Sequence, residues 1–320
     1  MEHVPDKYGF KKGAELFPLM VVVEFSNVCN AYCDHCVYTN VPSLRKKVPE
    51  KYALQDMFSM LATEVAEHKS FLRITGTGEP FVHPQAMDIF IDALDKGVRL
   101  GIITNGSLLV PEKSEKLLDK GIEVLEISVD AADEKTYEIV RKGLSWKKLL
   151  TNIDFMLKYR DDNKLKSKII VSIVDQPSKL NVPEAKAYWD KKVDYVIVRK
   201  YLTYELGEEK EDRQPFITTE GMSPCPHPFE RIVLLANGET RICNNDLRHG
   251  INMGTYPDQS IKEIWAGAML NHYRKNILCG NYDKNVMCKN CTEWRYRSWN
   301  YNFFHALDNA DAKKQELQKV

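Results

Sequence analysis

The first two hundred residues of the chain alternate between short apolar runs and longer amphipathic stretches. Apolar residues are nearly continuous within each run, as expected for parallel strands that are covered on both faces. Strands are predicted over Leu19–Phe25, Phe71–Thr75, Leu100–Thr104, Val124–Val129, Ile169–Val174 and Tyr195–Val198. The amphipathic stretches near residues 50–68, 84–96, 112–120, 146–160 and 182–191 are long enough to be the helices that connect these strands.

This rhythm predicts an α/β fold, in the form of an open or partial (β/α)6 barrel. A complete barrel of eight repeats would need about 250 residues, more than this region contains. The rhythm stops at a polar stretch, so we expect a barrel over residues 1–202, a linker over 203–224, a second domain over 225–295 and a tail over 296–320. The charged end of that tail, Asp308–Val320, is typical of a solvated helix or a frayed terminus.

Charge and cysteine content narrow the functional classes. Lysine plus arginine and aspartate plus glutamate number 45 each, so no binding of nucleic acid or of anionic membranes is expected. The first residues lack the apolar core of a secretory signal, and a cytoplasmic protein is expected. The eight cysteines are then more consistent with metal ligands or catalytic thiols than with disulfides.

Three of these cysteines, Cys29, Cys33 and Cys36, lie on one short loop directly after the first predicted strand. Active-site loops of α/β sheets and barrels occupy this position. Three thiolates can ligate three irons of a [4Fe–4S] cluster and leave the fourth iron open to a small molecule. The alternative is a structural zinc loop with a remote fourth ligand, although structural zinc usually uses paired C-x2-C units.

The C-x3-C-x2-C spacing, with the aromatic His35 before its last cysteine, resembles the signature of the radical S-adenosylmethionine (SAM) superfamily. This resemblance implies that SAM binds the open iron and that one electron cleaves it to a 5′-deoxyadenosyl radical. The radical then abstracts hydrogen from a small-molecule substrate. The resemblance also implies an external one-electron donor of the flavodoxin or ferredoxin type.

Further motifs follow the next predicted strands in the order that this resemblance implies. Gly76-Thr77-Gly78-Glu79-Pro80 resembles the family's Gly-Gly-Glu-Pro element, which binds the methionine ammonium through backbone carbonyls and the glutamate. Four further residues resemble family positions that contact the ribose and adenine of SAM: Thr104, Asn105, Ser128 and Asp130. Arg141 resembles the family arginine that binds the methionine carboxylate.

A second set of cysteines lies after the linker and consists of Cys225, Cys243, Cys288 and Cys291. Asn237-Gly238 between the first two is typical of a β-hairpin turn, which would carry both towards the C-x2-C pair. Four thiolates suit either a structural zinc or a fully ligated [4Fe–4S] cluster, and the spacing alone favours zinc.

The order of the second set resembles the SPASM or twitch extension of radical SAM enzymes, which holds auxiliary iron–sulfur clusters. No cysteine follows Cys291, which resembles the shorter, twitch-type arrangement of 2-deoxy-scyllo-inosamine dehydrogenases. The fold class is therefore expected to be completed by a small C-terminal α+β twitch/SPASM-like domain. The resemblance implies two [4Fe–4S] clusters and the dehydrogenation of an alcohol carbon in a sugar or aminocyclitol, with the auxiliary cluster accepting an electron.

The sequence alone leaves other functions and residue roles open. Cys279 could donate a hydrogen atom to a substrate radical, which would make the protein an epimerase, or it could be a structural thiol. Arg199, at the end of the sixth predicted strand, could bind substrate or assist proton transfer. The aromatic segment Trp294–Trp299 is expected to dock the C-terminus. A peptide-modifying maturase and a zinc-stabilised, non-enzymatic binding protein are the remaining alternatives.

Overall fold

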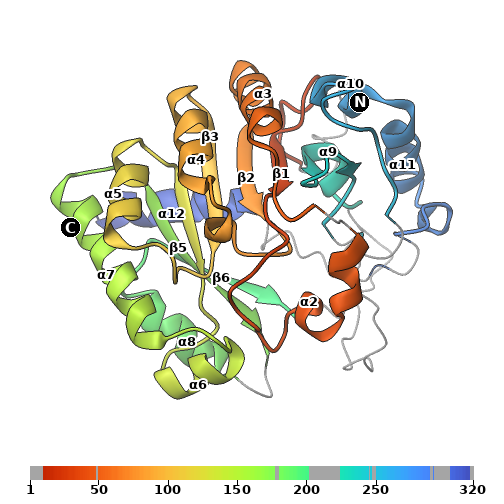
Figure 1. The fold of residues 1–320 in the computed structure, drawn as a ribbon. Helices are drawn as coiled ribbons and strands as arrows, with labels where there is room; N and C mark the ends of the chain where they lie inside the picture. Colours follow the sequence, from red (N-terminus) through yellow and green to blue (C-terminus); the bar gives the residue numbers. More distant parts are fainter. Residues whose placement is uncertain are drawn as a thin grey trace.

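A single eight-stranded sheet organises the computed structural model, which describes residues 10–47, 50–176, 180–201, 224–244, 246, 250–288, 291 and 303–317. The strands follow the order β6-β5-β4-β3-β2-β1-β7-β8 across the sheet (Figure 1). Their bounds are β1 Met20–Glu24, β2 Phe71–Thr75, β3 Arg99–Thr104, β4 Val124–Ser128, β5 Lys168–Asp175, β6 Tyr195–Lys200, β7 Arg231–Leu234 and β8 Thr240–Arg241.

Helices connect the strands and cover the sheet. The α-helices are α2 Val37–Asn40, α3 Gln55–Glu67, α4 Ala86–Asp95, α5 Pro111–Asp119, α6 Glu134–Val140, α7 Trp146–Asp162, α8 Val182–Trp189, α9 His227–Glu230, α10 Ile261–Ala266, α11 Ala268–Leu278 and α12 Phe303–Leu317. Short 3-10 turns, η1 Pro42–Lys47, η2 Pro80–Val82 and η3 Tyr282–Lys284, lie between them.

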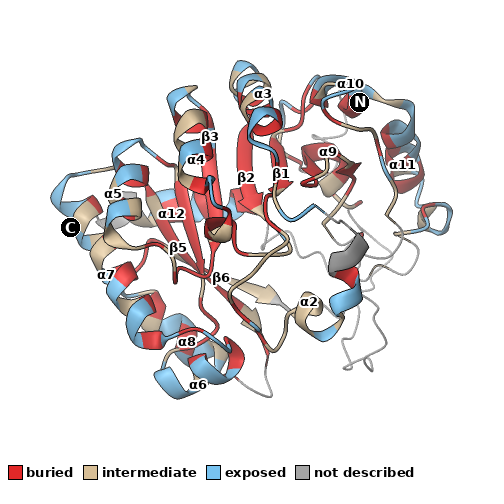
Figure 2. Cartoon of the chain, in the orientation of Figure 1, coloured by how far each residue is buried: buried red, intermediate tan, exposed pale blue. Residues whose placement is uncertain are grey.

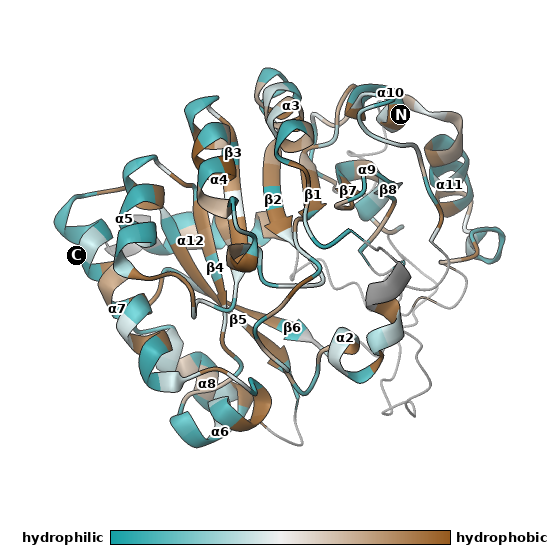
Figure 3. Ribbon diagram, in the orientation of Figure 1, coloured by the Kyte–Doolittle hydropathy of each residue, from teal (hydrophilic) through white to brown (hydrophobic). Residues whose placement is uncertain are grey.

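The six predicted strands are all present, each within two residues of its expected ends, and they pair in parallel in chain order. The five predicted connecting helices are also present. Helix α6 was not predicted, because its seven residues are too few for a helical period to stand out. The α/β fold with a partial parallel barrel is therefore confirmed, and its strands form the buried, apolar centre of the molecule (Figures 2 and 3).

Alternate residues of each strand face two different layers. On β1, Val21 and Val23 pack in the large core beneath the connecting helices, whereas Met20 and Val22 belong to a second core on the opposite, inner face. Both cores are apolar, which explains why the strand sequences do not alternate. Glu24 continues the inner row and therefore lies at the carboxyl end of the strand on the barrel's inner side.

The first residues of helix α12 cover the inner face of the sheet, whereas Asp308, Asn309, Asp311 and Ala312 further along it are exposed, as expected for a solvated helix. Phe303, Phe304 and Leu307 are buried against inner residues of β1, β2, β4, β5, β6 and β7. Figure 1 shows α12 lying against the strands, on the side away from α4 and α5. The apolar positions 303, 306, 307 and 310 recur at helical spacing, and they form the face that this contact requires.

The region after the predicted linker does not begin a separate sheet. Strand β7 pairs in parallel with β1, with Met20 opposite Arg231, and thereby extends the barrel sheet by one strand. β8 then pairs antiparallel with β7 through the predicted turn, in which Gly238 has a φ of +86° and its N–H donates to the Leu235 carbonyl. No helix in the described part of the chain is long and apolar enough to cross a membrane.

Candidate functional site

The loop that carries Cys29, Cys33 and Cys36 follows β1 and is held by hydrogen bonds from two sides. The Tyr32 N–H donates to the Lys142 carbonyl at 2.8 Å and the Asp34 N–H to the Val140 carbonyl at 3.0 Å. The loop is thereby fixed to the segment around Arg141. Three thiols thus project from a short, partly buried loop at the carboxyl end of the sheet.

The side chain of Asn30 links the same loop to the segment after β3. Its Oδ1 accepts from Asn105 Nδ2 at 2.8 Å, and its Nδ2 donates to Ser107 Oγ at 2.9 Å. The segment Thr104–Ser107, which contains the predicted site residues Thr104 and Asn105, therefore lies directly against the cysteine loop. Sequence reasoning did not single out Asn30 because an asparagine between two cysteines carries no period or motif of its own.

A buried ion pair lies beside the middle cysteine. Arg141 Nη2 is 2.5 Å from Asp130 Oδ2, and Arg141 Nη1 is 3.5 Å from Cys33 Sγ. Burial opposes the charge of Arg141, but Asp130 and Cys33 hold its pKa above the usual value. His35 Nε2 lies 3.6 Å from the same Asp130 oxygen. The structure therefore brings together four residues that the sequence placed in one site.

Asp130 is held in a conformation that few non-glycine residues adopt. Its φ is +58°, and its Oδ1 accepts a hydrogen bond from the Val174 N–H at 2.6 Å. Such left-handed positions cluster at functional sites, where the surroundings enforce them. The carboxylate is thus oriented by β5, while the nearby Ser128 hydroxyl meets the Ser172 hydroxyl at 3.4 Å.

The Gly76–Pro80 segment packs closely against the cysteine loop. The Glu79 N–H donates to the Val28 carbonyl at 2.8 Å. A Cβ on Gly78 would lie 2.2 Å from that carbonyl oxygen, which no side chain allows. Thr77 Oγ1 adds a hydrogen bond to the Ser26 carbonyl at 3.2 Å. Glycine at position 78 is required by this contact between the two loops.

Glu79 is buried, and its carboxylate has three hydrogen-bond donors. Thr104 Oγ1 donates to it at 2.6 Å, the Asn105 N–H at 2.8 Å and the Phe81 N–H at 3.1 Å. Burial raises the pKa of Glu79 despite these donors. The carboxylate thereby joins the loops after β2 and β3. Its predicted contact with the methionine ammonium stays a prediction.

The chemistry of this loop fits an iron–sulfur cluster with one open iron. Three thiols lie on one short loop, and burial raises the pKa of Cys33, which the neighbouring Arg141 offsets only in part. Iron supplies the positive charge that stabilises such buried thiolates. The predicted residues that would hold a bound SAM, which supplies the radical chemistry, are those of the Gly76–Glu79 segment with Thr104, Asn105 and Ser128.

The second set of cysteines is also brought together. Burial raises the pKa of the Cys225 thiol well above its usual value, and the thiolates of Cys243, Cys291 and Cys288 raise it further. His227 Nδ1 lies 3.5 Å from Cys243 Sγ. Among the described residues, no three His, Cys, Asp or Glu side chains converge on one single-ion position. Four neighbouring thiols suit a structural zinc or a fully ligated [4Fe–4S] cluster.

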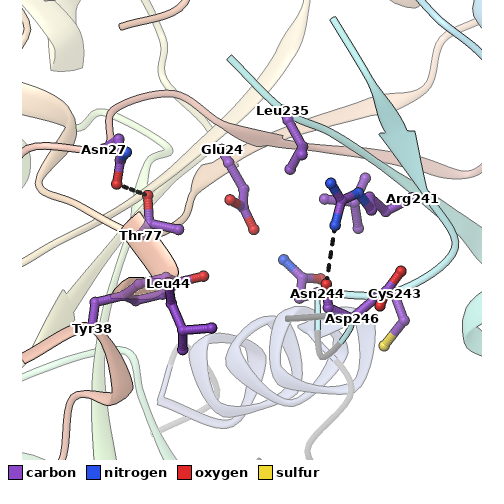
Figure 4. Close-up of a pocket in the computed structure, with 11 residues that line it drawn as sticks. Glu24, Asn27, Tyr38, Leu44, Thr77, Leu235, Arg241, Cys243, Asn244 and Asp246 are labelled. Atoms are coloured by element: carbon purple, nitrogen blue, oxygen red, sulfur yellow. Dashed lines mark hydrogen bonds between the residues drawn. The ribbon is translucent and has the colours of Figure 1, made fainter. Parts of the chain in front are cut away.

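A pocket with about 440 Å³ of empty space, which includes open solvent, lies between the segments that follow β1 and β2 and the segment that carries Cys243 (Figure 4). Asn27, Tyr38, Leu44 and Thr77 line it from the side of the first cysteine loop. Arg241, Cys243, Asn244 and Asp246 line it from the side of the second set, and Glu24, Val233 and Leu235 complete it. A mixed apolar and polar lining of this kind is typical of sites for small molecules.

Two predicted site residues lie elsewhere. Arg199 forms an ion pair with Glu126, at 2.6 Å, inside the barrel. Cys279 is exposed at the C-cap of α11 and does not line the pocket. Their proposed roles in substrate binding and hydrogen donation stay predictions. The aromatic segment Trp294–Trp299 and residues 203–223 of the predicted linker lie outside the described residues.

Sequence reasoning missed the pocket residues Glu24, Arg241 and Asp246. A signal was available for Glu24, because it continues the inner row of Met20 and Val22 at a period of two. An acidic residue in a row that is otherwise apolar marks a position where the row reaches a polar site. Arg241 and Asp246 had no such signal, because the short β8 and the loop after it lack a period.

Comparison with protein families finds a match for each of the two regions that carry a cysteine set. Residues 23–173 match the radical SAM superfamily, and residues 225–292 match SPASM, an iron–sulfur cluster-binding domain. The AdoMet-dependent heme synthase of Methanosarcina barkeri is 32% identical over 124 residues, which are 39% of this chain and 34% of that protein. The chain spans about a third of the length of the first curated relatives it matches.

Solved structures share the fold at low sequence identity. BtrN in complex with AdoMet and 2-DOIA is 19% identical, with a TM-score of 0.57, over 87% of this chain and 93% of BtrN. Streptococcus suis SuiB bound to the precursor peptide SuiA is 13% identical, with a TM-score of 0.63, over 84% of this chain and 68% of SuiB. The radical SAM match implies SAM and a [4Fe–4S] cluster, and the SPASM match implies an auxiliary iron–sulfur cluster. The chain therefore carries a radical SAM domain over residues 23–173 and a C-terminal SPASM domain over residues 225–292.

Proposed function

We propose that the protein is a radical SAM dehydrogenase that oxidises an alcohol carbon of a small polyhydroxylated molecule, of the sugar or aminocyclitol type. The observation that carries this proposal is the pocket between the two cysteine sets, whose lining includes Thr77 beside one set and Cys243 of the other. A substrate bound there would lie between the source of the 5′-deoxyadenosyl radical and an electron acceptor. Loss of a hydrogen atom, a proton and an electron converts an alcohol into a ketone.

The polar lining supports a hydroxylated substrate. Asn27 and Asn244 offer amide groups and Thr77 a hydroxyl, while Leu44, Val233 and Leu235 offer apolar surface. Rings that carry several hydroxyl groups need both kinds of contact. A first electron must reach the Cys29–Cys36 cluster from outside, and we propose a donor of the flavodoxin or ferredoxin type.

The four thiols of Cys225, Cys243, Cys288 and Cys291 support oxidation. If all four ligate an auxiliary [4Fe–4S] cluster, no iron is left to bind substrate, and electron transfer is its available role. Cys279 lies at the exposed end of α11 and outside the pocket lining, which favours dehydrogenation over an epimerisation that uses this thiol.

Anaerobic purification tests the cofactor part of the proposal. The wild-type protein should be brown and contain roughly eight irons and eight sulfides per chain, as two [4Fe–4S] clusters require. A colourless protein loaded with zinc would overturn it.

Turnover tests the reaction. The reduced protein should cleave SAM in the presence of a polyol or aminocyclitol and form one 5′-deoxyadenosine per ketone, as detected by mass spectrometry. The matched control replaces Cys29, Cys33 and Cys36 by alanine and should form neither product. Inversion of the carbinol centre, with solvent deuterium in the recovered substrate, would instead establish an epimerase.

A further inference from the structure

Glu24 is an acidic side chain at a position that neither cysteine set explains. It ends β1 on the inner side of the barrel and lines the pocket between the two sets. In Figure 4 its carboxylate points into the space bounded by Asn27 and Thr77 on one side and by Arg241 and Asn244 on the other. A substrate in this pocket would therefore meet the carboxylate.

The carboxylate of Glu24 has no hydrogen bond or ion pair with any side chain or backbone group in the described part of the chain. The nearest cation, Arg241, already donates to Glu239 Oε2 at 2.9 Å and to the Asp246 carbonyl at 3.2 Å. Burial raises the pKa of Glu24 to about 7, and Arg241 offsets this only in part. Glu24 is half-buried, and a carboxylate without donors from the protein takes its hydrogen bonds from water or from a ligand.

Other carboxylates at this end of the barrel are already occupied. Glu79 accepts three hydrogen bonds from its own chain. Asp246, which also lines the pocket, accepts from the Gly250 N–H at 3.0 Å and from the Ile251 N–H at 2.9 Å. Arg199 is paired with Glu126. Among the carboxylates that line the pocket, Glu24 is thus the one whose oxygens are available to a ligand.

We propose that Glu24 is a catalytic residue, which accepts a hydrogen bond from the hydroxyl group on the carbon that is oxidised and then takes up its proton. This inference rests on the proposed dehydrogenase function and deepens it. The substrate class is a neutral or cationic alcohol, because a carboxylate or phosphate beside Glu24 would be repelled.

In the proposed step the substrate is a secondary alcohol. The hydrogen atom on carbon passes to the 5′-deoxyadenosyl radical and forms 5′-deoxyadenosine. The hydroxyl proton passes to the Glu24 carboxylate, and the remaining unpaired electron passes to the auxiliary iron–sulfur cluster. The C–H and O–H bonds break, the C–O bond becomes a carbonyl, and the substrate loses two electrons in total.

The test compares wild-type holoenzyme with Glu24→Gln, which keeps the size and a hydrogen-bond acceptor but cannot take up a proton. The matched control is Glu123→Gln, which changes a carboxylate at the start of β4, paired with Arg99 far from the pocket. The probes are glucose, glucosamine, myo-inositol and 2-deoxy-scyllo-inosamine, each deuterated at its hydroxyl-bearing carbons. The probe that yields ketone with the wild-type protein is used for the variants.

With Glu24→Gln, deuterium should still reach 5′-deoxyadenosine, whereas ketone formation should fall roughly 100- to 10,000-fold, the usual contribution of a general base. Electron paramagnetic resonance should then show less reduced auxiliary cluster after a single turnover. Equilibrium dialysis with unreduced enzyme and SAM should show substrate binding within about tenfold of the wild-type affinity, because glutamine still accepts a hydrogen bond. Glu123→Gln should match the wild-type protein in all three measurements.

Ketone formation at the wild-type rate by Glu24→Gln would overturn the role of Glu24 while the proposed function stands. Loss of deuterium transfer together with ketone, at wild-type iron content, would also overturn it, since Glu24 would then position substrate and not accept its proton. If Glu24→Gln fails to load both clusters, Glu24→Asp replaces it and should slow ketone formation at least tenfold. Absence of ketone from every probe with the wild-type protein would overturn the proposed function itself.

Discussion

At the scale of single residues, the buried Glu126 and the half-buried Glu24 of the same sheet illustrate how the surroundings determine the charge of a carboxyl group. Glu126 lies between two arginines, with Oε2 2.8 Å from Arg73 and Oε1 2.6 Å from Arg199. Burial alone would raise its pKa, but Arg199 and Arg73 outweigh burial and lower the pKa to about 2. Glu24 has no such partners, and burial raises its pKa to about 7. Glu126 is therefore suited to stabilising the barrel as a charged group, and Glu24 to exchanging a proton.

Replacing Glu126 by glutamine is expected to destabilise the protein by about 3–5 kcal/mol at pH 7, because two buried or half-buried arginines lose their counter-charge. The folded-state pKa is below the unfolded value, so the stabilisation is present above about pH 4.5 and is lost as pH falls towards 2. Urea unfolding of wild-type and variant apoprotein at pH 7 and pH 3 should therefore show a difference that narrows in acid. An equal difference at both pH values would contradict this assignment.

Gly78→Ala should disrupt the cofactor site through sterics alone. The added Cβ would lie 2.2 Å from the Val28 carbonyl oxygen, so the loop that carries Glu79 must move away from the cysteine loop. We expect at least tenfold weaker SAM binding by equilibrium dialysis at near-normal iron content. The matched control is Gly97→Asn, where no atom lies within 4 Å and the φ of +79° is one that asparagine tolerates. Wild-type SAM affinity in Gly78→Ala would exclude the contact as a requirement.

At the scale of elements, α12 closes the inner face of the barrel sheet. Phe303 packs edge-on against Phe71 of β2, with ring centroids 5.1 Å apart, and Arg73 lies 4.2 Å over its ring. Asn309 Nδ2 donates to the Tyr195 hydroxyl at 3.1 Å, which fixes the helix beside β6. The helix thus covers apolar strand residues and also supports the charged pair of Arg73 and Glu126.

Phe303→Ala should lower the free energy of unfolding by about 3–5 kcal/mol, as for other large-to-small changes at buried aromatic positions. The neighbouring His305 is exposed, and His305→Ala on the same helix should change stability by less than about 0.5 kcal/mol. Chemical denaturation measures the free energy of unfolding of the two variants, and their difference distinguishes a packed helix from a solvated one. Equal stability of both variants would mean that α12 is not needed to close the barrel.

At the scale of the whole molecule, the sheet joins the two cysteine sets. β1 leads into the first set, and β7, its parallel neighbour, lies between Cys225 and Cys243 in the chain. β8 runs antiparallel to β7, with Arg241 opposite Val233, so Cys225 before β7 and Cys243 after β8 belong to the same end of this hairpin. Residues of β1, β7 and β8 line one pocket, and the pairing of these strands therefore sets how the two cysteine sets lie relative to each other.

Because each cysteine set is held by its own loops, the two clusters should load independently. A variant with Cys29, Cys33 and Cys36 changed to alanine should retain roughly four irons per chain, as should one with Cys225, Cys243, Cys288 and Cys291 changed to alanine. Iron and sulfide analysis after anaerobic reconstitution measures this. Loss of all iron in either variant would show that one cluster is required for the other to form.

Much of the barrel could be predicted because parallel strands covered on both faces are recognisable locally. Residues such as Val21–Val23 are apolar without interruption, and the helices between strands have a clear period. The spacing of Cys29, Cys33 and Cys36 likewise predicted the radical SAM domain, whereas the spacing of the second set alone favoured zinc and only its resemblance to SPASM indicated an iron–sulfur domain. In contrast, the burial of Phe303 and Leu307 and the pairing of β7 with β1 depend on contacts between segments far apart in the chain. Local patterns carry no information about which distant surface covers an apolar face.

The sequence by itself determined the kind of chemistry, because three thiols on one loop and a glycine-glutamate segment after the next strand are features of neighbouring residues. Only the tertiary structure decided where that chemistry could act. In the folded protein Glu24 lines the pocket, Arg199 forms an ion pair with Glu126, and Cys279 is exposed. The physical reason is that a pocket is formed by the ends of strands that pair across the sheet, and the partners of a buried charge come from other elements of the fold.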